Sequence, residues 1–219
     1  MNRKLISWFG LAGITALLSY TAAVVFSPAA YPGYDWMRQA VSDLSALNAP
    51  SRMLWNQLAA VYNTGNVVCV SCVSAFVSEQ RTGTRLFRTG IHLFTLMNWV
   101  SAIGYAMFPL ADSGMEITSF QEIMHIAVTA AVVLLSVVSL VILIIAGFRR
   151  KDLKRTGLWA FIALVMMMTG AIGQGIVPAK YFGIVERFSV FAAAGFTAVL
   201  GWELFTGFSG VKEDRQIIL

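Results

Sequence analysis

Long apolar stretches separated by short polar segments run along the whole chain. Apolar residues dominate six stretches, at residues 5–26, 54–76, 89–108, 124–148, 157–177 and 184–208. Each stretch is long enough to cross a bilayer, because a hydrocarbon core of roughly 30 Å requires about 20 helical residues. The pattern predicts one all-α domain over residues 1–219, built as a polytopic membrane bundle of six transmembrane helices.

Composition excludes a water-soluble fold. Hydrophobic residues make up 58% of the 219 residues and charged residues 12%, whereas soluble domains carry roughly 25% charged residues. The first apolar stretch follows Asn2-Arg3-Lys4 and exceeds the 7 to 15 residues or so of a signal-peptide core. We therefore expect it to be retained as the first helix.

The basic residues set the predicted orientation. Twelve of the 16 lie before the first stretch, in residues 79–88, in residues 149–155 or in the tail, and the other four are Arg38, Arg52, Lys180 and Arg187. The positive-inside rule then places both termini in the cytoplasm, in a multi-pass protein of the cytoplasmic membrane. Because the charges flank apolar spans and line no soluble face, the net charge of +5 indicates no nucleic-acid partner.

The first outer segment, residues 27–53, is long enough to need its own structure. Within it, Trp36, Met37, Ala40, Val41 and Leu44 recur at helical spacing, and polar residues occupy the opposite side. This spacing predicts a short interfacial helix over residues 36–44 that covers the outer helix ends as a lid.

Polar residues inside the spans are the first candidates for function, because burying them in lipid is costly. Asn56, Asn63 and Asn66 have the spacing of a single face on the second span. They form hydrogen bonds between helices, or they line a polar cavity open to the outer side. Four further residues would complete such a cavity wall: Asn98, Ser101, Thr169 and Gln174.

The predicted topology collects the acidic residues and one histidine at the outer end. Catalytic candidates are His125, Asp43 and Glu122, and Glu122 and His125 share a helix face because three positions separate them. His92 lies at the cytoplasmic end of its span, most of a bilayer away from His125, so a two-histidine site is not expected. No cofactor is predicted, and the alternative is a metal ion on His125 with two carboxylates drawn from Asp43, Asp112, Glu122 or Glu186.

Other motifs favour structural roles. Cys69 and Cys72 lie on one face of an apolar stretch and are interpreted as small packing residues. The chain contains no nucleophile elbow and no phosphate-binding glycine loop. Small residues in the last two spans predict close helix packing and offer faces for a homo- or hetero-oligomer: Gly170, Gly173, Ala192, Ala193 and Gly195.

Three short motifs carry a family resemblance. These are Val41-Ser42-Asp43-Leu44-Ser45-Ala46 with Pro50 and Leu54-Trp55-Asn56, then Gly104-Tyr105-Ala106-Met107-Phe108-Pro109 with Asp112 and His125, and Gly183 with Glu186-Arg187. Together they resemble the prokaryotic membrane family catalogued as domain-of-unknown-function family 998. Ser42-Asp43 is distantly similar to the outer-loop motif of DRAM-like membrane proteins. The resemblance implies a six-helix bundle and no activity, and it marks these polar positions: Asp43, Asn56, Asp112, His125, Glu186 and Arg187.

The leading functional hypothesis is an outward-facing polar pocket that binds a lipid headgroup or small polar molecule. Asp43 and Arg187 would form its charged centre and His125 one wall, with membrane lipids as partners. One alternative is a hydrolase or transferase acting on outer-leaflet lipid, with His125 as general base or metal ligand. The other is a non-catalytic scaffold or accessory subunit.

Overall fold

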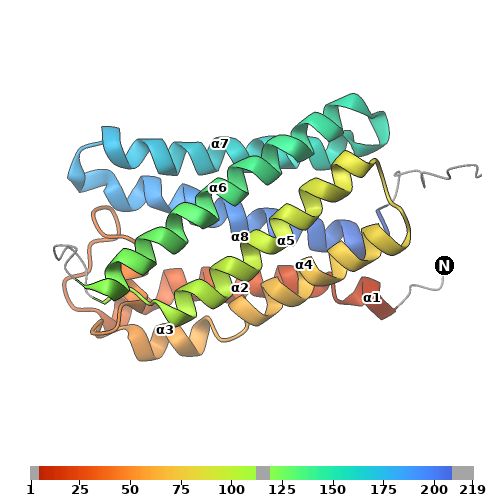
Figure 1. Ribbon diagram of the computed structural model, residues 1–219. Coiled ribbons are helices and arrows are strands. Elements are labelled where there is room, and N and C mark those ends of the chain that lie inside the picture. The colour runs from red at the N-terminus through yellow and green to blue at the C-terminus, as the bar shows by residue number, and fades with distance from the viewer. Residues whose placement is uncertain (1–4, 112–118, 209–219) are drawn as a thin grey trace, which may run out of the picture.

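The computed structural model describes residues 5–111 and 119–208, and within them all elements are helical, as predicted (Figure 1). The six long helices are α2 (Leu11–Phe26), α4 (Tyr62–Glu79), α5 (Arg85–Met107), α6 (Phe120–Arg149), α7 (Lys154–Ile176) and α8 (Phe182–Thr206). The short α-helices are α1 (Leu5–Trp8) and α3 (Arg52–Leu58). Single turns of 3-10 helix are η1 (Ser27–Ala30), η2 (Ser42–Ser45), η3 (Lys151–Leu153) and η4 (Ala179–Tyr181).

Five helical segments of the described chain are long and apolar enough to cross a membrane. They are Leu5–Ala30, Arg52–Glu79, Phe120–Arg149, Lys151–Ile176 and Ala179–Thr206. These segments indicate a membrane protein. The remaining long helix, α5, is less apolar because it carries Arg88, His92 and Asn98 along its length.

The long helices form a ring. Their contacts follow the order α8, α2, α4, α5, α6, α7 and return to α8, and α4 also contacts α8 across the ring. Glycines allow the closest approaches, as where Gly10, just before α2, packs against the backbone of Gly201 in α8. Aromatic and aliphatic side chains fill the centre, where the rings of Phe94 and Phe196 meet edge to face at 5.0 Å.

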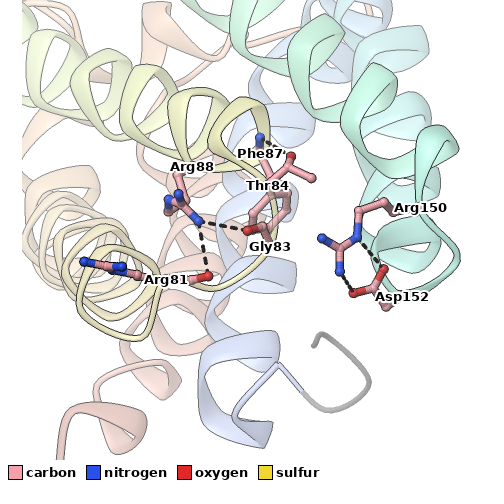
Figure 2. A network of polar contacts seen from close by, with 7 residues as sticks. All are labelled: Arg81, Gly83, Thr84, Phe87, Arg88, Arg150 and Asp152. Atoms are coloured by element: carbon pink, nitrogen blue, oxygen red, sulfur yellow. Dashed lines mark hydrogen bonds and ion pairs between the residues drawn. The ribbon is translucent and has the colours of Figure 1, made fainter. Parts of the chain in front are cut away.

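One end of the ring is basic. Figure 2 shows Arg88 of α5 donating to the carbonyls of Gly83, at 2.8 Å, and Arg81, at 3.2 Å, in the turn between α4 and α5. The α6–α7 connection lies beside it, where Arg150 pairs with Asp152 at 2.7 Å. We call this the basic end.

At the opposite end, residues 34–46 fold into the ring as a segment that we call the plug. The predicted interfacial helix over residues 36–44 does not form; in its place are a turn at residues 35–39 and η2. Leu44 is 0% exposed and Asp43 only 7% exposed. The physical reason is that side chains from elsewhere in the chain satisfy the plug's backbone groups, so it needs no helical hydrogen bonds.

The second predicted span is not one continuous helix. α3 ends at Leu58, and a turn in which the Tyr62 N–H donates to the Ala59 carbonyl at 2.9 Å separates it from α4. Asn56 therefore lies on a different helix from Asn63 and Asn66. The predicted three-asparagine stripe is wrong, because it assumed one continuous helix from Asn56 to Asn66.

Candidate functional site

Arg187 of α8 joins the ring to the plug. Its Nη1 donates to the carbonyls of Trp36, at 2.7 Å, Gln39, at 3.2 Å, and Gly183, at 2.7 Å. Its Nη2 donates to the Tyr34 hydroxyl at 2.9 Å, and that hydroxyl donates in turn to the Ala40 carbonyl at 2.8 Å. The planar guanidinium is thus held in one orientation at the edge of the plug.

Two acidic residues of this end, Asp43 and Glu186, also bind the backbone of the plug. The Glu186 carboxylate accepts from the Val41 N–H at 3.0 Å, and the Asp43 carboxylate accepts from the Ala40 N–H at 3.0 Å. The Gly183 N–H donates to the Met37 carbonyl at 2.9 Å. Gly183 and Glu186 lie on the same turn of α8 as Arg187, so this turn supplies most of the polar contacts that hold the plug.

Burial and the charges of this cluster shift the pKa of the Tyr34 hydroxyl. Burial raises the pKa of its hydroxyl, and the positive charge and hydrogen bond of Arg187 partly oppose this rise. Asp43 and Glu186 lie near enough to push the pKa of Tyr34 further upward. The cluster therefore holds a neutral tyrosine, two acidic side chains and one arginine.

A pocket opens beside this cluster, and we call it the Arg187 pocket. It has a volume of about 310 Å³ and is lined by Val24, Val25, Pro28, Tyr34, Trp36 and Arg187. The guanidinium carbon lies 5.8 Å from the centre of the Trp36 ring, which is 54% exposed. One wall is therefore cationic and aromatic, and the other is the apolar end of α2.

His125 lies elsewhere, in the second turn of α6. Its Nδ1 is 2.8 Å from the Phe108 carbonyl oxygen, and its ring packs 5.1 Å from that of Tyr105. It lines an open groove of about 790 Å³ together with residues of α6, Gln174 of α7 and Phe182 of α8. We call this the α6–α7 groove.

The structure thus divides the predicted site in two. Asp43, Glu186 and Arg187 come together at the plug, and Arg187 lines the pocket beside α2. His125 lines a different cavity, which shares no lining residue with the Arg187 pocket.

Comparison with protein families places most of the chain in a known family. Residues 14–203 match the model of a protein family of unknown function, DUF998. The chain belongs to this family. No curated protein and no solved structure matches it, so the distant similarity to DRAM-like proteins stays a prediction.

Of three further predicted site residues of this DUF998 protein, the structure describes two, and both lie at other positions. Glu122 forms a capping box with Ser119 at the start of α6, in which each side chain binds the backbone N–H of the other. Asn56 is exposed on α3. Asp112 lies outside the described residues.

The polar cavity wall predicted for this family member is not assembled. Asn63, Thr169 and Gln174 are exposed on the outer surface of the ring, as is Asn56. Only Asn66 and Asn98 are buried, and the Asn98 amide donates to the Phe94 carbonyl of its own helix at 3.0 Å. The error lay in inferring a common wall from membrane depth, which leaves the direction around each helix undetermined.

Other residues singled out in the DUF998 sequence serve packing. Cys69 is buried against the carbonyls of Gly10 and Thr197. Gly170 and Gly173 pack inside the chain against Ser189 and Val185 of α8. Among the described residues no three His, Cys, Asp or Glu side chains gather as metal ligands.

Sequence reasoning missed part of the Arg187 pocket. Tyr34 went unnoticed, although a tyrosine between apolar stretches is a common sign of the membrane interface. The apolar wall from Val24, Val25 and Pro28 carried no distinguishing signal, because these residues resemble any span end.

Proposed function

We propose that this protein is a six-span protein of the cytoplasmic membrane whose outer face binds the phosphate of an anionic lipid headgroup in the Arg187 pocket. The observation that carries the proposal is the composition of this pocket. One fixed guanidinium and two aromatic side chains face the apolar residues Val24, Val25 and Pro28.

The orientation follows from the charges at the two ends. Basic side chains from the α4–α5 and α6–α7 connections gather at the basic end, which the positive-inside rule places in the cytoplasm. The plug and Arg187 then face outward. α5 supplies the sixth span, because its 23 residues extend about 34 Å at a rise of roughly 1.5 Å per residue.

The chemistry of the pocket suits a phospholipid at this depth. Arginine binds phosphate oxygens through its planar N–H donors. Four hydrogen bonds already fix its orientation, so little further ordering is needed on binding. The exposed Trp36 ring occupies the level that tryptophan prefers in membranes, between headgroup and hydrocarbon, and the end of α2 provides contact for the glycerol and first acyl carbons.

The test is phosphatidylglycerol binding to the full chain in phosphatidylcholine nanodiscs, measured by native mass spectrometry after release of the protein. Arg187→Gln should weaken binding roughly 10- to 150-fold, because a charge-assisted hydrogen bond contributes about 1.5–3 kcal/mol. Arg38→Gln is the matched control, since it removes the same charge from an exposed plug residue outside the pocket.

A second pair of variants separates binding from plug docking. Val25→Trp should fill the pocket and weaken binding while Arg187 itself is unchanged, whereas Leu18→Trp changes a similarly exposed position of α2 outside the pocket. Equal binding of phosphatidylglycerol and phosphatidylcholine, or unchanged binding in both Arg187→Gln and Val25→Trp, would overturn the proposal.

A further inference from the structure

The α6–α7 groove is closed at the basic end and open toward the plug end. At the basic end the backbones of α6 and α7 meet at two glycines, where a Cβ placed on Gly157 would lie 2.8 Å from the Cα of Gly147. From there the two helices diverge (Figure 1). α6 stays beside α5 and α7 beside α8, so the groove opens between the two pairs on the outside of the ring.

The lining of the groove changes from polar to apolar along α6. His125 and Thr129 lie at its outer part with Gln174 of α7 across from them. The remaining α6 residues that line it are apolar: Ile126, Ala130, Val133, Leu134 and Val137. From Thr129 to Val137 this surface extends about 12 Å along the helix. Such a surface suits a molecule with a small polar head and a hydrocarbon chain.

Hydrogen bonding at His125 defines the chemistry of that head. The Phe108 carbonyl can only accept, so the hydrogen of the His125 contact lies on Nδ1, and the neutral form of the ring offers Nε2 as an acceptor. The Thr129 hydroxyl donates to the His125 carbonyl at 2.9 Å and accepts from the Tyr105 hydroxyl at 3.1 Å. The acceptor at Nε2 calls for a hydroxyl donor on the ligand.

Charge narrows the class of ligand further. None of the nine residues lining the groove is a lysine, arginine, aspartate or glutamate. Among the described lining residues, a phosphate or carboxylate head would find no lysine or arginine, in contrast to the Arg187 pocket. We infer that the α6–α7 groove binds a neutral lipid alcohol, with its hydroxyl donating to His125 Nε2 and its hydrocarbon chain along Ala130 to Val137.

The probe is 1-monooleoylglycerol with a diazirine in its acyl chain, photo-crosslinked to the full chain in phosphatidylcholine nanodiscs. Phosphatidylcholine is a suitable background, because its headgroup has no hydroxyl donor. Labelled peptides should come from α6 and α7. Unlabelled monooleoylglycerol should compete at lower concentration than oleate or oleoyl lysophosphatidate.

Matched variants test whether residues of the α6–α7 groove bind the monooleoylglycerol probe. Ala130→Trp should abolish site-specific labelling by filling the groove, and Ala127→Trp should not, because Ala127 is an exposed α6 residue outside it. His125→Phe keeps a ring and removes the acceptor, so affinity should fall roughly 2- to 10-fold, the range expected for one neutral hydrogen bond. Equal labelling in Ala130→Trp and Ala127→Trp, or equal competition by oleate, would refute the inference.

Different variants test the two binding proposals, so each proposal can be refuted without the other. Arg187→Gln should leave monooleoylglycerol labelling within twofold of wild type, and Ala130→Trp should leave phosphatidylglycerol binding unchanged. Loss of labelling in Arg187→Gln would show that the groove is not an independent site.

Discussion

Gly183→Ala should release the plug from α8 with little effect on the rest of the ring. A Cβ placed on Gly183 would overlap the Gln39 carbonyl oxygen and lie 2.5 Å from that of Trp36. Both atoms belong to backbone that Arg187 already holds, so neither can move away without breaking a hydrogen bond. α8 and the plug must therefore separate at this point.

The magnitude follows from the cost of overpacking. Inserting one methyl group into a well-packed site costs about 1–3 kcal/mol, which corresponds to a roughly 5- to 150-fold larger opening equilibrium constant for the plug. The gain in helix propensity from glycine to alanine is at most about 1 kcal/mol and is smaller in the first turn, where Gly183 lies. The steric cost therefore dominates.

The assay is amide hydrogen exchange of residues 36–46, followed by mass spectrometry. The amides of Ala40 and Val41 report directly, because they donate to the carboxylates of Asp43 and Glu186. Gly195→Ala is the matched control: it lies in the same helix, and an added Cβ there would meet no atom within 4 Å. Equal exchange of these amides in Gly183→Ala and wild type would refute this account of the plug.

Two further predictions concern the start of α6 and the plug. Ser119→Ala should speed amide exchange in the first turn of α6, because losing an N-cap side chain costs about 0.5–2 kcal/mol; unchanged exchange would contradict the capping role of Ser119 and Glu122. The raised pKa of Tyr34 means that its contribution to plug stability is complete below the unfolded tyrosine pKa of about 10 and is lost as pH rises through the folded value. Plug exchange, corrected for its intrinsic pH dependence, should accelerate over that alkaline range, and Tyr34→Phe should remove this component.

The fold class could be predicted from the sequence because lipid imposes it. Apolar length alone locates the helices, since backbone groups in hydrocarbon must find their partners within the helix. The break between α3 and α4 was not predictable in this way, because Ala59-Ala60-Val61 is as apolar as a continuous span. The capping box of α6 carried a local signal that was overlooked, the spacing Ser119-x-x-Glu122.

The plug shows why the candidate site was predicted only in part. Its helical periodicity is real, but the partners that decide its structure, Glu186 and Arg187, lie about 150 positions later in the chain. Membrane topology correctly placed Asp43 and both partners at one end. It could not show that His125 faces a different gap in the ring, because depth in the bilayer does not determine direction around it.

The first turns of α8 contact the plug and line both the Arg187 pocket and the α6–α7 groove. Within six residues, Phe182 lines the α6–α7 groove, Gly183 and Glu186 bind the plug, and Arg187 lines the pocket beside α2. A displacement of this segment would therefore change both cavities and the plug together. The Gly183 and Glu186-Arg187 positions have steric and hydrogen-bonding roles that do not require a shared catalytic centre with His125. This separation favours two binding surfaces on either side of α8 over one composite active site.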